Sequence, residues 1–361
     1  MTGAGRAGAS PECTQALLAK SGIHRIALPT PFPVGRINCY LIEDEPLTLI
    51  DTGPNSGRSL DELARALEGL GYRFEDLGLI VITHQHMDHM GLLEIVARRS
   101  GAEVAALDLL APYLEDFGAS AAADGAFSMQ IMRRHGVPKD LAIALGVLAA
   151  SFRAFGSSGR VTRVLHDGDE LVLRERTLRV LHRPGHSPTD TLFWDERRAM
   201  LIAGDHLLAH ISSNPLISRR LPSEPGEAEG PGEACGLERP HALLQYIASM
   251  RATREIPAEI VLTGHGEPVL DHVALIDERF RMHERRARKL LRMLAPGPLS
   301  AYALATRMWG KAAVTQAFLT ISEVLGHMDL LIADGLVHED DRGPVSRFVA
   351  VGDSGGPARR P

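Results

Sequence analysis

Residues 81–91 read VITHQHMDHMG and place three histidines and one aspartate within six positions. The side chains of His84, His86, Asp88 and His89 are of the kinds that bind divalent metal ions. The apolar run before them, LGLIVIT, predicts a buried strand, and the run after them, LLEIVARRSG, predicts a helix. Because residues two apart point to the same side of an extended chain, this segment predicts one wall of a metal site.

Three later strand-like runs also end in a candidate ligand beside a glycine. HRPGHSPTD presents His186, LIAGDHLL presents Asp205, and VLTGHGEP presents His265. Glycine lets the backbone turn sharply close to an ion. Five histidines and two aspartates are too many for one tetrahedral zinc ion. They suit two metal ions that share a bridging carboxylate.

The pattern around these segments alternates between strands and helices. Residues 23–51 predict three strands, residues 58–70 a helix ending at Gly71, and residues 161–208 further strands, so the fold class is layered α/β. Residues 108–160 interrupt the strands as an Ala-rich helical insertion, and 209–239 form a Pro/Gly/Glu-rich loop that we expect to be flexible. We expect a flexible leader at 1–22 and a disordered tail at 352–361.

The C-terminal part has a different pattern. An arginine-rich helix over 272–294 is followed by three helices and a hairpin within 299–350, an order that predicts a small winged-helix-like domain over 272–351. The helix is interpreted either as a phosphate-binding surface or as a solvated linker whose leucines pack inward, and we favour the linker because only one aromatic residue, Phe280, lies among the cations. The cations are Arg279, Arg281, Arg285, Arg286, Arg288, Lys289 and Arg292.

Bulk composition excludes several classes of protein. The chain has 361 residues, 45% hydrophobic and 23% charged, and no apolar run approaches the roughly 18 residues of a membrane span. Three scattered cysteines (Cys13, Cys39 and Cys235) argue against a disulfide framework, so we expect a cytoplasmic protein. A net charge of −6 gives no overall attraction to nucleic acid or to anionic membranes.

The ordered set of seven ligands resembles that of the metallo-β-lactamase-fold hydrolases, with the HxHxDH motif of the family at His84–His89. The resemblance covers residues 23–271 and implies an αββα sandwich. It also implies that the first metal binds His84, His86 and His186. The second metal would then bind Asp88, His89 and His265, with Asp205 between the two. Asp51, in LIDTG, matches the aspartate that orients a ligand in this family.

Other residues near the motifs have more than one interpretation. His206, beside Asp205, is expected to support a ligand or to pack rather than to bind metal. His210 and Asn214 are candidates to face the substrate, with ordinary loop hydrogen bonding as the alternative. Asp88 is the candidate catalytic residue, since it could orient the attacking hydroxide and accept its proton. The insertion is interpreted either as a roof that accepts an acyl chain or as the surface of a homodimer.

The resemblance implies hydrolysis by a hydroxide that bridges two divalent ions, zinc being expected and iron or manganese the alternatives. Within this superfamily the same ligands serve thioesters, lactones, β-lactams and phosphodiesters. We favour an ester or thioester of a small metabolite, such as an acyl-CoA-like compound, over a lactone. The C-terminal region resembles the winged-helix extension of the lactamase-like endoribonucleases, so cleavage of RNA is a further alternative. A non-catalytic regulator that binds DNA is disfavoured because all seven ligands are present.

Overall fold

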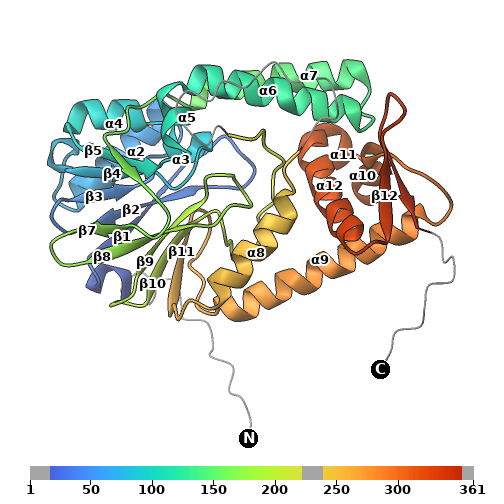
Figure 1. The fold of residues 1–361 in the computed structure, drawn as a ribbon. Helices are drawn as coiled ribbons and strands as arrows, with labels where there is room; N and C mark the ends of the chain where they lie inside the picture. The colour runs from blue at the N-terminus through green and yellow to red at the C-terminus, as the bar shows by residue number, and fades with distance from the viewer. Residues whose placement is uncertain (1–16, 222–238, 352–361) are drawn as a thin grey trace, which may run out of the picture.

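The computed structural model describes residues 17–221 and 239–351. Two β-sheets face each other, and each carries helices on its outer face (Figure 1). The first sheet has the order β1 (Ile23–Leu28), β2 (Ile37–Ile42), β3 (Thr48–Ile50), β4 (Leu79–Val81), β5 (Glu103–Leu107) and β6 (Arg163–Leu165). The second has the order β11 (Ile260–Thr263), β10 (Met200–Gly204), β9 (Thr191–Asp195), β8 (Thr177–His182) and β7 (Glu170–Val172).

Alternation along the strands builds the layers. In β4, Leu79 and Val81 enter the core between the sheets, whereas Ile80 enters the core beneath the outer helices. Successive side chains of a strand point to opposite faces, so a strand of three buried residues serves two cores. The helices over the first sheet are α2 (Gly57–Gly69), α3 (Met87–Met90) and α4 (Leu93–Ser100), with a short turn η1 (Phe74–Asp76), and α8 (Ala242–Arg254) covers the second. The expected αββα sandwich is confirmed.

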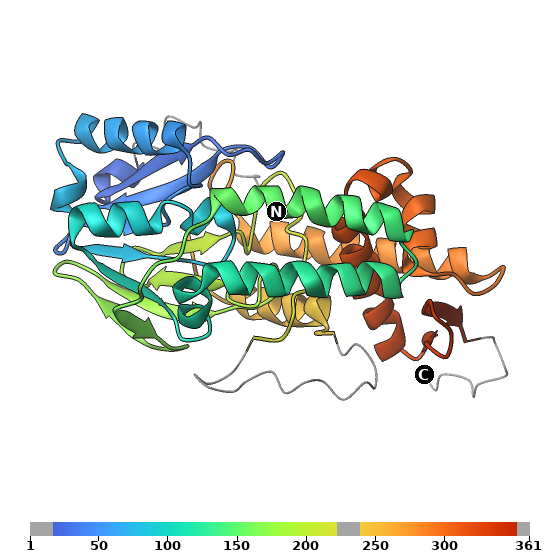
Figure 2. The same cartoon turned by 90° about the horizontal axis from the view of Figure 1, so that it is seen from above.

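The expected insertion is helical. It consists of α5 (Ala111–Glu115), α6 (Phe117–Arg134), α7 (Lys139–Phe152) and η2 (Arg153–Phe155). Seen from above, α6 and α7 run side by side from the sandwich to the C-terminal helices (Figure 2). The turn between them packs there, because Ile131 and Val137 share a buried cluster with Leu304 and Phe348. The insertion is therefore anchored at both ends.

The C-terminal region comprises α9 (His272–Leu294), α10 (Ala301–Trp309), α11 (Ala312–Thr315), α12 (Ala317–Ala333) and the hairpin β12 (Val337–Asp340) with β13 (Arg347–Ala350). Three helices followed by a hairpin is the predicted order, although the assignment as a winged helix stays a prediction. In such modules a helix enters the DNA groove. The third helix here, α12, contains no lysine or arginine and is largely buried.

Three expectations about segments need correction. The leader is shorter than 1–22, because residues 17–20 form a helical turn and Leu18 is buried between the sheets; residues 1–16 lie outside the described part. The loop 209–239 is not flexible throughout, because Ser213 and Ile217 are buried, while 222–238 lie outside the described part, as does the tail 352–361. The leucines of α9 pack inward, as the linker interpretation expects, but the helix is not otherwise a solvated linker, since Arg279 and His283 are also buried.

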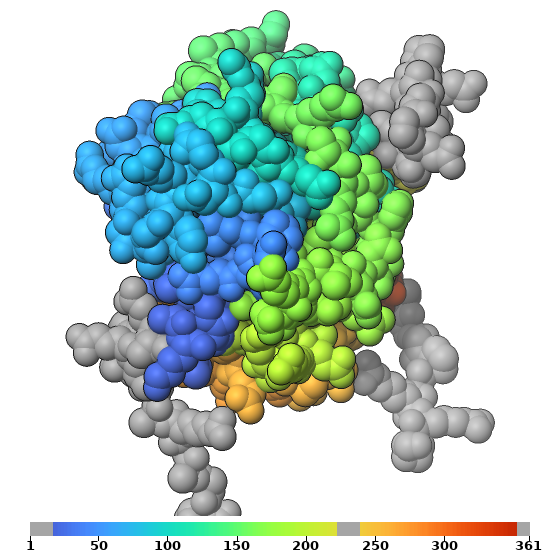
Figure 3. Space-filling view, turned by 90° about the vertical axis from the view of Figure 1, so that its left-hand side faces the viewer, coloured from blue at the N-terminus to red at the C-terminus, as the bar shows by residue number. Residues whose placement is uncertain are grey.

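Seen from the end opposite the C-terminal helices, the surface is formed by the sandwich and its own helices (Figure 3). In Figure 1 the C-terminal helices α10, α11 and α12 lie at one end of the sandwich. Within the described ranges, no helix is both long enough and apolar enough to cross a membrane.

Candidate metal centre

The candidate ligands meet where several strands end. His84 and His86 follow β4, Asp88 and His89 lie in α3, and His186 lies in the loop between β8 and β9. Asp205 and His265 follow β10 and β11, which are parallel neighbours. The backbone comes so close to the ligands that a Cβ atom on Gly264 would lie 2.2 Å from Asp205 Oδ1. Only glycine fits that position.

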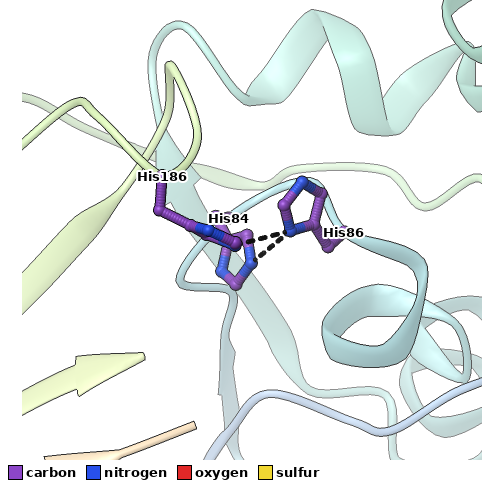
Figure 4. A group of neighbouring side chains, drawn as sticks. All are labelled: His84, His86 and His186. Atoms are coloured by element: carbon purple, nitrogen blue, oxygen red, sulfur yellow. Dashed lines mark hydrogen bonds between the residues drawn. The ribbon is translucent and has the colours of Figure 1, made fainter. Parts of the chain in front are cut away.

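A first group of three histidines is drawn together in Figure 4. His86 Nδ1 lies 3.0 Å from His84 Nε2 and 3.0 Å from His186 Nε2. A tetrahedral zinc ion bound at about 2.0–2.1 Å holds its nitrogen ligands about 3.3 Å apart, so this spacing is close to that of a metal site. The three residues form one of the groups whose ligand atoms lie within 4.8 Å of one another.

A second group lies beside the first, and Asp205 reaches both. Asp88 Oδ2 is 3.2 Å from His265 Nε2, and Asp205 Oδ1 is 3.4 Å from His89 Nε2. The other oxygen, Asp205 Oδ2, is 3.5 Å from His265 Nε2 and 3.6 Å from His186 Nε2. The carboxylate of Asp205 therefore lies between the two groups. All seven predicted ligands are brought together.

In four of the five ligand histidines, a hydrogen bond from Nδ1 to another protein group fixes which ring nitrogen faces the centre. His186 Nδ1 donates to the carbonyl oxygen of Asn214 at 3.1 Å, and His265 Nδ1 donates to that of Arg36 at 2.9 Å. A carbonyl only accepts, so each Nδ1 carries the proton and each Nε2 presents a lone pair. Such partners are typical of metal-binding histidines.

Asp51 fixes the rings of His89 and His84. Its Oδ2 accepts from His89 Nδ1 at 2.7 Å and from the Thr83 hydroxyl at 2.8 Å. Since the Thr83 proton points to Asp51, the Thr83 oxygen accepts from His84 Nδ1 at 3.0 Å. Asp51 has a φ of 59°, in the left-handed region that aspartate tolerates better than most residues. The predicted orienting position of Asp51 agrees with this geometry.

Burial and charge act in opposite directions across the site. Burial lowers the pKa of His86 to about 3 and that of His84 well below its usual range. Burial also lowers the pKa of His89, but the carboxylates of Asp205 and Asp51 outweigh it and raise that pKa well above its usual range. Burial disfavours the charged carboxylate of Asp205, yet the surrounding histidines hold its pKa well below the ordinary value.

These residues fit divalent cations. Lone pairs of His84, His86 and His186 converge at about 3 Å, which is repulsive unless a cation or proton lies between them. His89 Nε2, His265 Nε2 and Asp205 Oδ1 are buried and have no hydrogen-bond partner among the residues that the structure describes. Buried polar groups are normally paired, so these atoms are available to bind metal ions.

The additional predicted residues differ in their surroundings. His206 is fully buried, with its Nε2 3.0 Å from the Thr253 hydroxyl and its ring against Tyr246, so it packs as one interpretation proposed. His210 is exposed and close to Gly266, next to His265. The side chain of Asn214 is instead engaged by the protein, because its Nδ2 donates to the carbonyl of Leu319 at 3.0 Å.

Several supporting residues escaped the sequence analysis. Gln85 Oε1 accepts from the hydroxyls of Ser187 (2.5 Å) and Thr189, which ties the first motif to the loop of His186. The Asn38 and Tyr40 side chains both donate to the carbonyl of Thr263, before His265. Ser187 and Thr189 could have been found from the sequence, because they lie in the segment HSPTD that begins with the ligand His186. Asn38 and Tyr40 carried no local signal.

A further group with metal-like spacing lies between α9 and α12. His283 Nδ1 donates to His327 Nε2 at 3.2 Å, and His327 Nδ1 donates to the carbonyl of Glu323 at 2.6 Å. The Glu323 carboxylate is already paired with Arg286. A chain of hydrogen bonds therefore accounts for the close approach of His283, His327 and Glu323 without a cation.

The fold and the converging ligands define a metal-dependent hydrolase class, and comparison with known proteins agrees. The model of the metallo-beta-lactamase superfamily matches residues 32–265, and the chain belongs to that superfamily. The probable metallo-hydrolase YqjP of Bacillus subtilis (strain 168) is 31% identical over 309 residues, which cover 86% of this chain and 92% of that one. This relationship supports assignment of the chain as a metallo-hydrolase.

Two solved structures share the fold. The metallo-beta-lactamase family protein TTHA1429 from Thermus thermophilus has a TM-score of 0.75 at 24% identity, covering 91% of this chain and 99% of that one. A beta-lactamase domain protein from Burkholderia ambifaria has a TM-score of 0.72 at 24% identity, covering 91% of both chains. The shared fold therefore extends beyond residues 32–265.

Proposed function

We propose that the protein binds two divalent metal ions, zinc in the first instance, and hydrolyses a carbonyl ester or thioester. The observation that carries this proposal is the set of lone pairs fixed by Asp51, Asn214 and Arg36 and directed into one buried centre. When bound, two such ions would supply hydroxide at neutral pH and polarise the carbonyl oxygen of the substrate. The side chains and carbonyls around the centre would then orient the metal ligands and transfer protons.

Asp88 is proposed as the group that orients the attacking water and accepts its proton. Burial raises the pKa of this carboxyl, but its close contact with His265 and the charge of His89 outweigh burial, so the pKa is lowered. Asp88 is thus ionised at neutral pH and can act as a base. It is buried beside His265, within reach of the space between the two groups of ligands.

An apolar cluster beside the centre supports an ester or thioester with an apolar group. The ring of Phe32 lies 5.5 Å from that of Phe152 and 6.3 Å from that of Phe155, and all three are half-buried. Phe32 belongs to the loop whose Arg36 carbonyl holds His265. The carbonyl of Phe155 accepts from Asn55 and abuts Gly91, just beyond His89.

The arrangement of cations argues against the RNA alternative. Arg279 and Arg286, counted above among candidate phosphate-binding residues, are instead held by backbone carbonyls and by Glu323. The exposed cations Arg281, Arg285, Arg288 and Arg292 recur at helical spacing, opposite the packed face of α9 that contains Arg279. An RNA strand bound to these exposed cations would lie away from the metal centre.

The first test combines metal content with two substrates. We expect about two metal ions per chain by elemental analysis, turnover of a chromogenic thioester, and no cleavage of a fluorescent RNA. His84→Ala is expected to lower both metal content and turnover, since it removes one lone pair of the first group. Exposed His166 provides the control His166→Ala, which should match the wild type. RNA cleavage without thioester turnover would overturn the substrate assignment.

The apolar cluster leads to a separate prediction about acyl chain length. Phe152→Ala is expected to raise KM about tenfold for an octanoyl thioester and to leave an acetyl thioester unchanged, because burying a large apolar side chain contributes about 1.5–3 kcal/mol. Val147→Ala is the control, since Val147 lies on the same helix and is 68% exposed. Equal effects on both thioesters would argue against an acyl-binding role.

A further inference from the structure

We infer that the C-terminal region positions the metal centre, and that Arg279 of α9 is its main positioning residue. The inference rests on the proposed metal-binding site, and it assigns a role to a region outside the match to the family model. Arg279 is 8% exposed, and its Nη2 donates to the carbonyls of Leu208 (3.2 Å), Ala209 (3.3 Å) and Ile211 (3.2 Å).

The segment that Arg279 holds, residues 205–217, contributes to the centre at two points. It begins with Asp205, whose carboxylate lies between the two groups of ligands. Further along, the carbonyl of Asn214 accepts the Nδ1 proton of His186. The two points are connected, because the Ser213 hydroxyl donates to the backbone carbonyl of Asp205 at 2.5 Å. A shift of this segment would therefore move one carboxylate and one ring together.

Other elements beyond the sheets hold the same segment. Tyr246 of α8 donates its hydroxyl proton to the carbonyl of His206 at 2.6 Å. From α12, the Leu319 carbonyl accepts from Asn214 Nδ2 at 3.0 Å, and the Ser322 hydroxyl accepts from the backbone N–H of Ile217 at 3.4 Å. Together with Arg279, these contacts fix the segment along its length.

Within the described part of the chain, the guanidinium of Arg279 forms hydrogen bonds only with this segment. No carboxylate of residues 17–221 and 239–351 lies within ion-pair distance of its guanidinium, although the side chain is almost fully buried. A buried cation without a counter-ion is costly unless it is well hydrogen-bonded. The planar guanidinium suits several carbonyls at once, which an ammonium group does less well. The side-chain hydrogen bonds of Arg279 to Leu208, Ala209 and Ile211 thus serve the loop that carries Asp205.

The chain provides a matched control on the same helix. Arg286 joins α9 to Glu323 of α12 and lies 6.0 Å from the ring centre of Trp309, but none of these contacts reaches residues 205–217. Removing either guanidinium weakens the packing of the C-terminal region. Only the loss of Arg279 frees the segment that bears Asp205. Comparison of the two variants therefore separates positioning from general stability.

The experiment measures zinc dissociation constants by competition with a chromophoric chelator in Arg279→Met, Arg279→Lys and Arg286→Met. Arg279→Met is expected to weaken at least one zinc site about 10–100-fold, the range seen when groups that orient metal ligands are lost. Arg279→Lys should recover part of that loss, and Arg286→Met should bind zinc like the wild type. Thermal midpoints, compared in the metal-free proteins, should fall similarly in both methionine variants.

Zinc affinity within twofold of the wild type in Arg279→Met, or an equal loss in Arg286→Met, would overturn the inference. If Arg279→Met does not fold, an unchanged affinity in Arg279→Lys would overturn it, and a weakened affinity would support it. Failure of the proposed function is a separate outcome. A wild-type protein that binds zinc but hydrolyses no ester or thioester would leave the affinity comparison intact.

Discussion

Asp88→Asn is expected to lower kcat by about 10²–10⁴-fold, the usual contribution of a positioned acid or base. Asparagine keeps the shape of aspartate and an oxygen that can face His265, but it cannot accept a proton at neutral pH. Metal content should therefore remain near that of the wild type while turnover is lost. The measurement is steady-state turnover of a thioester, with metal analysis of the same sample.

Exposed Asp61 on α2 supplies the control Asp61→Asn, which should retain full activity. Wild-type turnover in Asp88→Asn would exclude a role in proton transfer. Loss of one metal ion in step with turnover would also contradict the proposal, because Asp88 would then act as a ligand alone.

The ligands could be predicted from the sequence because each occupies a short motif at the end of an apolar strand. The groups that orient them could not all be predicted. His186 and His265 are held by the backbone carbonyls of Asn214 and Arg36, and a carbonyl leaves no trace in the residue type. Asp51 was recognisable only because its own motif resembles that of a family. The supporting partners became visible once distant segments were placed side by side.

The role of the arginine-rich helix shows a second limit of prediction from the sequence. Helical spacing separates the buried positions of α9 from its exposed ones, but it does not say what the buried positions touch. Arg279 lies on the packed side with His283 and Leu290, and its partners are about 70 residues earlier in the chain. Similarly, the insertion and the C-terminal helices share one buried cluster although they are far apart in sequence. The sequence pattern alone suggested that the insertion and the C-terminal region were two separate units.

The metal-free protein is expected to lose stability steeply between pH 6.5 and about pH 4, through histidines remote from the metal centre. Burial, followed by the charge of neighbouring His327, lowers the pKa of His283 to about 4. Burial lowers that of His327 to about 4 as well, with Arg286 acting in the same direction and the Glu323 carbonyl against it. Arg279 also faces His283 and lowers its pKa, while Glu323 raises it.

His135 behaves in the same way on another element. Burial lowers its pKa to about 3, with Arg239 and Arg134 acting in the same direction, although Glu339 lies 3.8 Å away. The native state keeps these three rings neutral, whereas the unfolded chain protonates them below a pKa of about 6.5. The unfolded state therefore binds more protons. For each ring, the free energy of unfolding decreases by about 1.4 kcal/mol for every unit by which the pH is lowered in this range.

Burial also raises the pKa of Asp190 and Asp329, and their native protonation opposes this trend, so variants are compared rather than absolute slopes. Urea unfolding with chelator at pH 7, 6 and 5 should show a shallower pH dependence in His283→Gln/His327→Gln, by up to about 3 kcal/mol per pH unit. Exposed His166 provides the control His166→Gln, whose slope should equal that of the wild type. An unchanged slope in the double variant would mean that the two rings already carry protons in the native state. The hydrogen-bonded chain from His283 through His327 to Glu323 would then be wrong, because a protonated His327 Nε2 could not accept from His283.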